Sequence, residues 1–333
     1  MSGDRPVFVV GCPRSGTTLL SLMLHAHPRI AIPPESRFLI STWRARERFG
    51  DLSTPQQCRA LARAVTRKGS RLRDLGLDPQ AVRRRILAAP PTLGSAFGTV
   101  FAMYAEQHDK VRWGDKRPLY YQEVDVLLRL FPDAQVVHIV RDPRAVVASL
   151  DTMPWWPFDT VGSAASWSQA EHCAQRDSRR LPADVFTTVR YESLVARPEQ
   201  ELRRLCAFLG EEFDPAMLAP SEVRHVVPEG KAWHGNLAAS VGTSRVEAWR
   251  EGLAPGDLGL VETVLHRGMR RWDHAPSGAG IRPGPVLRAR YAADLAARQG
   301  AMRRRWLQEA FEVRRSHRQV AARLTSGQRA LQE

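Results

Sequence analysis

Cysteine and long apolar runs are scarce in this sequence, and each scarcity excludes a class of protein. The chain has four cysteines, which form neither a Cys-x-x-Cys pair nor a metal-ligand spacing, so a disulfide scaffold and a zinc site are not indicated. No apolar run reaches the roughly 20 residues that a helix needs to cross a bilayer. Residues 1–6 are too short and too polar a stretch for a signal peptide. We therefore expect a cytoplasmic protein without a membrane span.

Positive charge, by contrast, is abundant and unevenly placed. The formal net charge is +14, and residues 276–333 hold twelve arginines against four acidic residues. The rest of the chain is moderately basic, which suits an anionic ligand. The basic end is typical of a solvated helix, with an acidic partner, a membrane or nucleic acid as alternatives. Nucleic acid is disfavoured, because a stacking platform needs interleaved aromatics and this segment has only Tyr291, Trp306 and Phe311.

The order of apolar stretches predicts an α/β fold. Three short β-branched runs are typical of buried parallel strands: residues 6–10, 135–140 and 185–189. Helical patterns cover residues 17–25, 144–150 and 199–209. An arginine-rich and mostly helical block separates the first two strands. This alternation favours a parallel sheet flanked by helices.

We expect one folded domain with a helical extension. Residues 1–275 would form the domain, and the block at about 41–110 would be a helical insertion in it. Residues 276–285 are rich in proline and glycine and are predicted to be a linker. Residues 286–333 are predicted to be a basic helical tail, either one long helix or two helices broken near Gly300. Pairing of these helices between two copies of the chain would give a homodimer.

The first chemical signal is a glycine-rich turn between the first strand and the first helix. It reads Gly-Cys-Pro-Arg-Ser-Gly-Thr-Thr from Gly11 to Thr18. Glycines let successive backbone N–H groups point at one oxyanion, and a helix N-terminus adds unpaired donors and a positive dipole end. The hydroxyls of Thr17 and Thr18 are further donors. The turn therefore predicts a phosphate or sulfate site.

Comparison with the triphosphate loop G-x-x-x-x-G-K-[ST] narrows the chemistry. Gly11, Gly16 and Thr18 fit that pattern, but Thr17 stands where the lysine belongs. In triphosphate enzymes that lysine reaches the β- and γ-phosphates, and the next hydroxyl binds Mg²⁺. The missing lysine argues against a nucleotide or small-molecule kinase, which is the first rival hypothesis. Arg14, inside the turn, can instead pair with a sulfate or phosphate through two hydrogen bonds.

A second anion site is indicated after the middle strand. The run from Val136 to Val140 leads directly into Arg141, and ligands of open parallel sheets lie beyond the carboxyl ends of the strands. Ser149 follows about two helical turns later. An arginine and a hydroxyl at this edge can hold a second phosphate. Two separated anion sites match the shape of 3′-phosphoadenosine 5′-phosphosulfate (PAPS), which carries a 5′-phosphosulfate and a 3′-phosphate.

These motifs together resemble those of the PAPS-dependent sulfotransferases. Residues 8–24, with Pro-Arg-Ser-Gly-Thr-Thr, resemble the family's 5′-phosphosulfate loop, and residues 137–150 resemble its 3′-phosphate motif. Residues 113–118, Trp-Gly-Asp-Lys-Arg-Pro, look like a segment of the bacterial members. Residues 189–199 look like the family's Tyr-Glu-x-Leu stretch. The resemblance covers about residues 5–275 and is nearer to bacterial and tyrosylprotein-type enzymes than to cytosolic ones.

The resemblance implies a P-loop-type parallel sheet and assigns roles to individual residues. The groups implied for the 5′-phosphosulfate are Arg14, Ser15, Gly16, Thr17 and Thr18. Those implied for the 3′-phosphate are Arg141 and Ser149. Tyr191 matches a nucleotide contact, and Ser244 with Arg245 loosely resembles a late loop that closes over the donor. Glu35 matches the base proposed in tyrosylprotein-type enzymes, and Lys116 matches a lysine that stabilises the transferring group.

The reaction implied is in-line transfer of a sulfuryl group from PAPS to a hydroxyl or an amine. Glu35 would take the acceptor proton, while Arg14, Lys116 and the loop N–H groups would stabilise the developing charge. His25 and His27, near the end of the first helix, stay open as alternative bases. No metal is expected, because a sulfuryl group carries less charge than a phosphoryl group.

The acceptor cannot be deduced from the sequence. A small molecule, a glycan and a peptide are all compatible with the motifs. Its pocket is expected in residues 36–110 and 151–180, because acceptor pockets are built from variable helices and loops. The second rival hypothesis is a non-enzymatic protein that binds nucleic acid or a partner through its basic tail.

Overall fold

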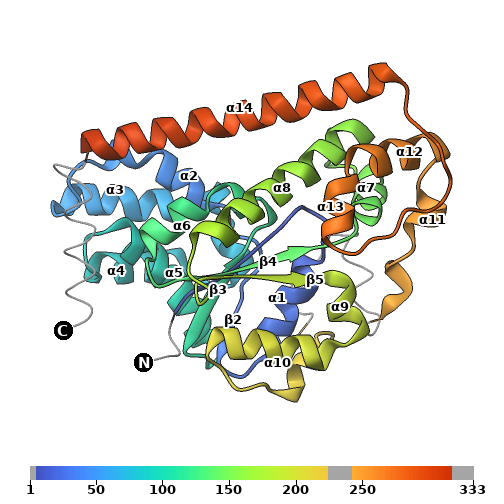
Figure 1. Cartoon of the computed structure of the whole chain (residues 1–333). Coiled ribbons are helices and arrows are strands. Elements are labelled where there is room, and N and C mark those ends of the chain that lie inside the picture. Colours follow the sequence, from blue (N-terminus) through green and yellow to red (C-terminus); the bar gives the residue numbers. More distant parts are fainter. Residues whose placement is uncertain (1–4, 224–241, 317–333) are drawn as a thin grey trace.

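The computed structural model describes residues 5–223 and 242–316, and its centre is a five-stranded sheet (Figure 1). All neighbouring strands run parallel, in the order β2-β3-β1-β4-β5. The strands are β1 Val7–Val10, β2 Ile30–Ala31, β3 Arg112–Lys116, β4 Gln135–Val140 and β5 Phe186–Arg190. This confirms the predicted α/β fold with a parallel sheet. β1 lies in the middle, so the chain that leaves it meets groups from both neighbouring strands.

Two of these strands were not predicted, and their composition explains why. β3 reads Arg-Trp-Gly-Asp-Lys and lacks a β-branched run. Its charged side chains are nevertheless buried, because Arg112 donates to the carbonyl of Leu209 at 2.8 Å and pairs with Glu211 at 3.0 Å. Hydrogen-bond partners that are distant in sequence therefore make this strand possible. β2 is too short to leave a periodic signal.

The strands send alternate side chains to two separate cores, as the period of a strand requires. Val7 and Val9 pack against one helical layer, and Phe8 and Val10 pack against the other. The first layer contains α1 Thr17–Ala26, α9 Tyr191–Ala196 and α10 Pro198–Leu209. Both faces of the sheet are covered, as expected for a parallel sheet.

The second layer contains most of the helices, including those of the predicted insertion (Figure 1). Its members are α2 Phe38–Arg44, α3 Pro55–Val65, α4 Pro79–Ala88, α5 Leu93–Gln107, α6 Val124–Leu130, α7 Pro143–Asp151 and α8 Thr160–Arg180. The short element η4 Pro118–Gln122 connects β3 to α6, and the short element η8 Thr243–Arg245 contacts α9. After η8 come α11 Trp249–Gly252, α12 Pro255–Val264 and α13 His266–Arg271.

The basic tail contributes one long helix, α14 Pro285–Ser316, which lies along α8 (Figure 1). It continues through Gly300, so the alternative of two helices broken there was wrong. Met302 is buried against Cys173, and Glu309 accepts a hydrogen bond from Trp43 Nε1 at 2.7 Å. Residues 276–284, in the predicted linker, form an irregular connection, and residues 317–333 lie outside the described residues.

None of the helices within residues 5–223 and 242–316 combines the length and the apolar character that crossing a membrane requires.

Candidate active site

The ends of four strands carry candidate residues to one edge of the sheet. The glycine-rich turn follows β1, and Lys116 is the last residue of β3. Arg141 follows β4 directly, and Tyr191 follows β5. Because parallel strands end at the same edge, residues from distant parts of the sequence meet there.

The glycine-rich turn is shaped by close contacts that only glycine allows. Gly16 has φ +96° and precedes α1, and a Cβ on it would lie 2.5 Å from Cδ2 of Tyr191. A Cβ on Gly11 would lie 2.4 Å from the carbonyl oxygen of Ile139 on β4. Arg14, between them, adopts the left-handed region at φ 71°. Without side chains at these two glycines, the turn lies directly against β4 and Tyr191.

We expect Gly16→Ala to lower the free energy of unfolding by about 1–3 kcal/mol, because alanine is strained at this φ and meets the Tyr191 ring. Urea unfolding at constant m-value measures the difference. Gly69→Ala is the matched control, since nothing lies within 4 Å of a Cβ added there. Equal unfolding free energies for the two variants would mean that Tyr191 moves aside without cost.

One cluster of side chains joins the turn to the end of β4. Arg14 Nε donates to Ser149 Oγ at 2.9 Å, so a residue of the turn contacts a residue of α7. Arg141 donates to the carbonyl oxygen of Arg14 at 3.1 Å and to that of Arg245 in η8 at 2.5 Å. Its guanidinium lies over the Tyr191 ring, 4.4 Å from the centroid. The structure thus brings together all five residues, although the sequence separates Arg14 from Arg245 widely.

This cluster concentrates positive charge, and one of its buried hydrogen-bond donors has no partner among the described residues. Burial lowers the pKa of Arg14, and the nearby charges of Arg141 and Arg245 lower it further. Burial also lowers the pKa of Arg141, whose Nε is buried and has no hydrogen-bond partner among the described residues. A buried donor without a partner is costly. An anion placed here would satisfy the donor and relieve the repulsion.

A second cluster lies on the other side of the α1 N-terminus. Lys116 Nζ lies 3.3 Å from Glu35 Oε1 and donates to Thr18 Oγ1 at 3.4 Å. The Lys116 side chain is 9% exposed, whereas that of Glu35 is 28% exposed. Glu35 is therefore open to a molecule arriving from solvent, and Lys116 is held behind it next to the turn.

Three residues that the sequence did not single out support this second cluster. Asp115 accepts hydrogen bonds from Ser36 Oγ at 2.9 Å and from Tyr120 Oη at 2.7 Å. All three are buried. Ser36 adjoins Glu35 and Asp115 adjoins Lys116, so the network joins the segments that carry them. The only sequence signal was the position of Asp115 within the Trp-Gly-Asp-Lys-Arg-Pro motif.

The two histidines considered as alternative bases lie elsewhere. His25 accepts a hydrogen bond at Nδ1 from the Ile32 N–H at 3.1 Å, and His27 Nε2 contacts the carbonyl of Glu212 at 2.9 Å. Both are buried at the C-terminal end of α1, whereas the cluster lies at its N-terminal end. Ten residues of helix are about 15 Å long. The structure therefore does not bring either histidine to the site.

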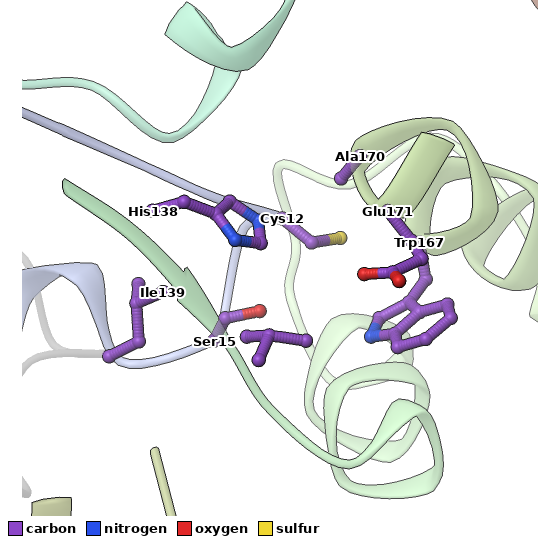
Figure 2. A pocket seen from close by; sticks show the side chains of 8 residues that line it. Cys12, Ser15, His138, Ile139, Trp167, Ala170 and Glu171 are labelled. Carbon is purple, nitrogen blue, oxygen red and sulfur yellow. The ribbon is translucent and has the colours of Figure 1, made fainter. Parts of the chain in front are cut away.

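Ser15 faces the protein interior and not the open edge of the turn. Its N–H donates to the carbonyl of Cys12 at 3.1 Å, and its buried Oγ has no partner among the described residues. Figure 2 shows the Ser15 hydroxyl directed into a small space lined also by Cys12 and Trp167, which has no room for a water molecule. The hydroxyl of Ser15 thus faces away from the cluster of Arg14 and Arg141, and its binding of the 5′-phosphosulfate stays a prediction.

The remaining candidates are placed as follows. Thr17 begins α1 and is buried, and Thr18 accepts from Lys116 as described. Ser244 lies beside Arg245 in η8. Within the described ranges, no group of three or more His, Cys, Asp and Glu is arranged to hold a metal ion.

The comparison with known proteins agrees with this fold. A sequence model of the sulfotransferase family matches residues 6–215, which is more than half of the chain. The chain belongs to the sulfotransferase family.

Individual relatives show how far the likeness extends. The nodulation protein NoeE of Sinorhizobium fredii is 30% identical over 287 residues, covering 78% of this chain and 63% of NoeE. A protein-tyrosine sulfotransferase of Drosophila melanogaster is 25% identical and covers 65% of this chain and 40% of its own length. The chain thus spans less than two thirds of either relative. Among solved structures, the sulfotransferase domain of the Synechococcus PCC 7002 olefin synthase matches with a TM-score of 0.57 and 26% identity, over 81% of this chain and 95% of that domain.

Proposed function

We propose that this protein transfers a sulfuryl group from PAPS to a hydroxyl acceptor by in-line displacement. The proposal rests above all on one observation, the presence of two polar clusters on either side of the α1 N-terminus. The first contains Arg14, Ser149 and Arg141, and the second contains Lys116 and Glu35. A donor such as PAPS needs one cluster that binds its nucleotide phosphates. It needs a second cluster next to the sulfur atom at which the transfer occurs.

The first cluster would bind the nucleotide. Arg141 and Ser149 would hold the 3′-phosphate, with the unsatisfied Arg141 Nε available as a donor. Tyr191 lies under the Arg141 guanidinium, and its ring offers an apolar surface next to the phosphate sites. The Arg14 side chain is hydrogen-bonded to Ser149 in this structure. To bind the 5′-phosphosulfate, the Arg14 guanidinium would have to turn toward it or bridge the two phosphate sites.

The second cluster would carry out the transfer. The acceptor oxygen would attack sulfur as its proton passes to Glu35, and the bond from sulfur to the bridging oxygen would break. The electron pair leaves with adenosine 3′,5′-bisphosphate, on whose phosphate the charge develops. Lys116 Nζ, which donates to Thr18 Oγ1 at 3.4 Å, would stabilise that charge. The bonds and electrons of this transfer balance without an oxidant or a metal ion.

A kinase function is not favoured by this site. The residue at the lysine position of the triphosphate loop is Thr17, and the lysine in the site comes from β3, where it pairs with Glu35. The triphosphate chemistry of kinases relies on a loop lysine and a bound Mg²⁺. ATP is therefore expected to bind much more weakly than the sulfotransferase donor.

The acceptor class is proposed from the names of relatives and from the exposure of Glu35. Relatives are named for a protein tyrosine and for an ω-hydroxylated dihydromenaquinone, both of which carry a hydroxyl. We expect a hydroxyl on a small molecule, glycan or peptide, bound between Glu35 and the helices of residues 36–110. A cytoplasmic location and a homodimer through the C-terminal helices stay predictions.

Calorimetric titration with adenosine 3′,5′-bisphosphate tests the donor site directly. The wild-type protein is expected to bind it, Arg141→Ala is expected to lose about 1.5–3 kcal/mol of affinity, the contribution of a hydrogen bond to a charged group, and ATP is expected to bind much more weakly. Arg203→Ala is the control, since this arginine is on the surface of α10, where it pairs with Glu199 and lies over the Phe213 ring.

Two results would contradict the proposal. Wild-type protein that ignores the bisphosphate and binds Mg-ATP would support the kinase hypothesis. Equal affinity for the bisphosphate in Arg141→Ala and wild type would remove Arg141 from the donor site. A thermal unfolding curve for each variant separates lost contacts from lost folding.

A further inference from the structure

Asp115 is a carboxylate buried at the end of β3, directly before Lys116. Its relative exposure is 0%, and every hydrogen bond it accepts comes from a neighbour of the site. Oδ2 accepts from Ser36 Oγ at 2.9 Å and from Tyr120 Oη at 2.7 Å. Oδ1 accepts from the Lys116 N–H at 2.9 Å. A buried charge persists in a protein only when it is well hydrogen-bonded, and Asp115 meets this requirement.

The partners of Asp115 lead to both halves of the site. Ser36 is the residue after Glu35, so the bond to Ser36 fixes the turn that presents Glu35 to Lys116. Tyr120 belongs to η4, whose first residue, Pro118, accepts a hydrogen bond at its carbonyl from the Gly11 N–H at 3.1 Å. The same carboxylate is therefore connected to the base candidate and to the start of the phosphate loop.

We propose that Asp115 is a positioning residue for sulfuryl transfer, which holds Glu35 and the phosphate loop at the correct separation through Ser36 and Tyr120. It would not touch either substrate, because it is enclosed. The inference rests on the proposed function, since positioning matters only if transfer occurs. Its effect would fall on the chemical step, because near-attack geometry is sensitive to displacements of about 1 Å.

The groups around Asp115 set its pKa, and the pKa sets the pH range in which Asp115 can hold Glu35 and the phosphate loop in position. Burial raises the pKa of Asp115 and the charge of Glu35 adds to the rise, while the hydrogen bonds from Tyr120, Ser36 and the Lys116 N–H oppose it, and the net pKa is about 6. Arg117 also lies near, with its guanidinium 5.9 Å from the centroid of the Tyr120 ring.

Protonation of Asp115 would loosen the network. The ionised carboxylate accepts two hydroxyl hydrogens at one oxygen, whereas a protonated carboxyl becomes a donor itself. A proton on Oδ2 would reverse or remove one of the bonds from Ser36 and Tyr120, and a proton on Oδ1 would weaken the bond from the Lys116 N–H. We therefore expect activity to fall as the pH drops through about 6.

The stability of the fold should change in the opposite direction. The pKa in the folded protein lies above the ordinary aspartate value, so between the two values the folded chain binds more protons than the unfolded chain. The contribution of this group to stability thus rises as the pH falls through about 6 and is lost as the pH rises. A residue with a purely structural role would not couple higher stability to lower activity.

The test compares wild type with Asp115→Asn, which keeps the shape and removes the charge. The readout is the release of adenosine 3′,5′-bisphosphate from PAPS in the presence of a phenol, a sugar or a tyrosine peptide, whichever the wild type sulfates fastest. We expect kcat to fall up to about 10²-fold with little change in KM for PAPS. The fall of wild-type kcat near pH 6 should be missing in the variant.

Thermal unfolding at several pH values adds a measurement independent of activity. The Tm of wild type relative to Asp115→Asn should increase as the pH is lowered through about 6, because only the wild type gains from protonation there. Ser36→Ala should reproduce part of the kcat loss, and the double variant Ser36→Ala/Asp115→Asn should lose less than the sum of the two.

The outcomes separate the inference from the proposed function. If the wild type transfers no sulfuryl group to any acceptor, the proposed function fails. If the wild type is active and Asp115→Asn keeps its kcat, or loses kcat with an unchanged fall near pH 6, the positioning role is wrong. Additive losses in the double variant would also overturn it, since they would place Ser36 and Asp115 in separate roles.

Discussion

Lys116→Met lowers kcat by about 10²–10³-fold and leaves PAPS binding nearly unchanged, if Lys116 stabilises charge in the transition state. Methionine keeps the length of the side chain and removes the ammonium group that lies 3.4 Å from Thr18 Oγ1. The ground state has less developing charge than the transition state, so the loss appears in kcat. Release of adenosine 3′,5′-bisphosphate under saturating PAPS measures it.

Lys110→Met is the matched control for this prediction. Lys110 is also partly buried, but its Nζ donates to the backbone carbonyls of His25 and Ile30 at the opposite end of α1. Burial lowers the pKa of Lys110 to about 8. Its replacement is expected to lower Tm and to leave kcat unchanged. An equal loss of kcat in both variants would show that any buried lysine matters, and it would contradict the role given to Lys116.

The parts of the fold that could be predicted were those with local signals. β4 was predicted at its observed ends, residues 135–140, because six consecutive buried residues leave an apolar run between polar ends. The helix after the glycine-rich turn was likewise expected, since the turn and the leucines adjoin each other. The failure at β3 has a physical cause: Arg112 and Asp115 are buried with partners that only the tertiary structure supplies.

In the candidate site, too, the residues with local motifs could be predicted, whereas the contacts between distant segments could not. The motifs placed Arg14 and Arg141 on two loops, and the structure adds the connection through the Arg14 carbonyl at 3.1 Å. The pairing of Glu35 with Lys116 could not be deduced from spacing, because the two belong to different strand ends. Sequence reasoning also left the base undecided between Glu35 and two histidines, a choice that depends on which end of α1 faces the site.

The two clusters imply a division of labour at the α1 N-terminus. Arg14 and Arg141 gather positive charge on the β4 side, where an anion would relieve the lowered pKa of Arg14. Lys116 and Glu35 form an ion pair on the β3 side, where the proposed transfer would move a proton and develop charge on the leaving group. A variant on the first side should therefore weaken donor binding, whereas a variant on the second should slow the chemical step.

Glu35→Gln tests the second side at the proton and should reduce kcat by about 10²–10⁴-fold, the usual contribution of a general base. The amide keeps the size of the side chain and cannot accept the acceptor proton. Adenosine 3′,5′-bisphosphate should bind to this variant as to wild type, because the proposed mechanism assigns Glu35 to the acceptor and not to the nucleotide. Glu47→Gln, at an exposed residue of η1 Arg46–Phe49, is the control with unchanged kcat. A fully active Glu35→Gln would mean that the acceptor loses its proton to solvent, and Glu35 would then serve only to hold Lys116.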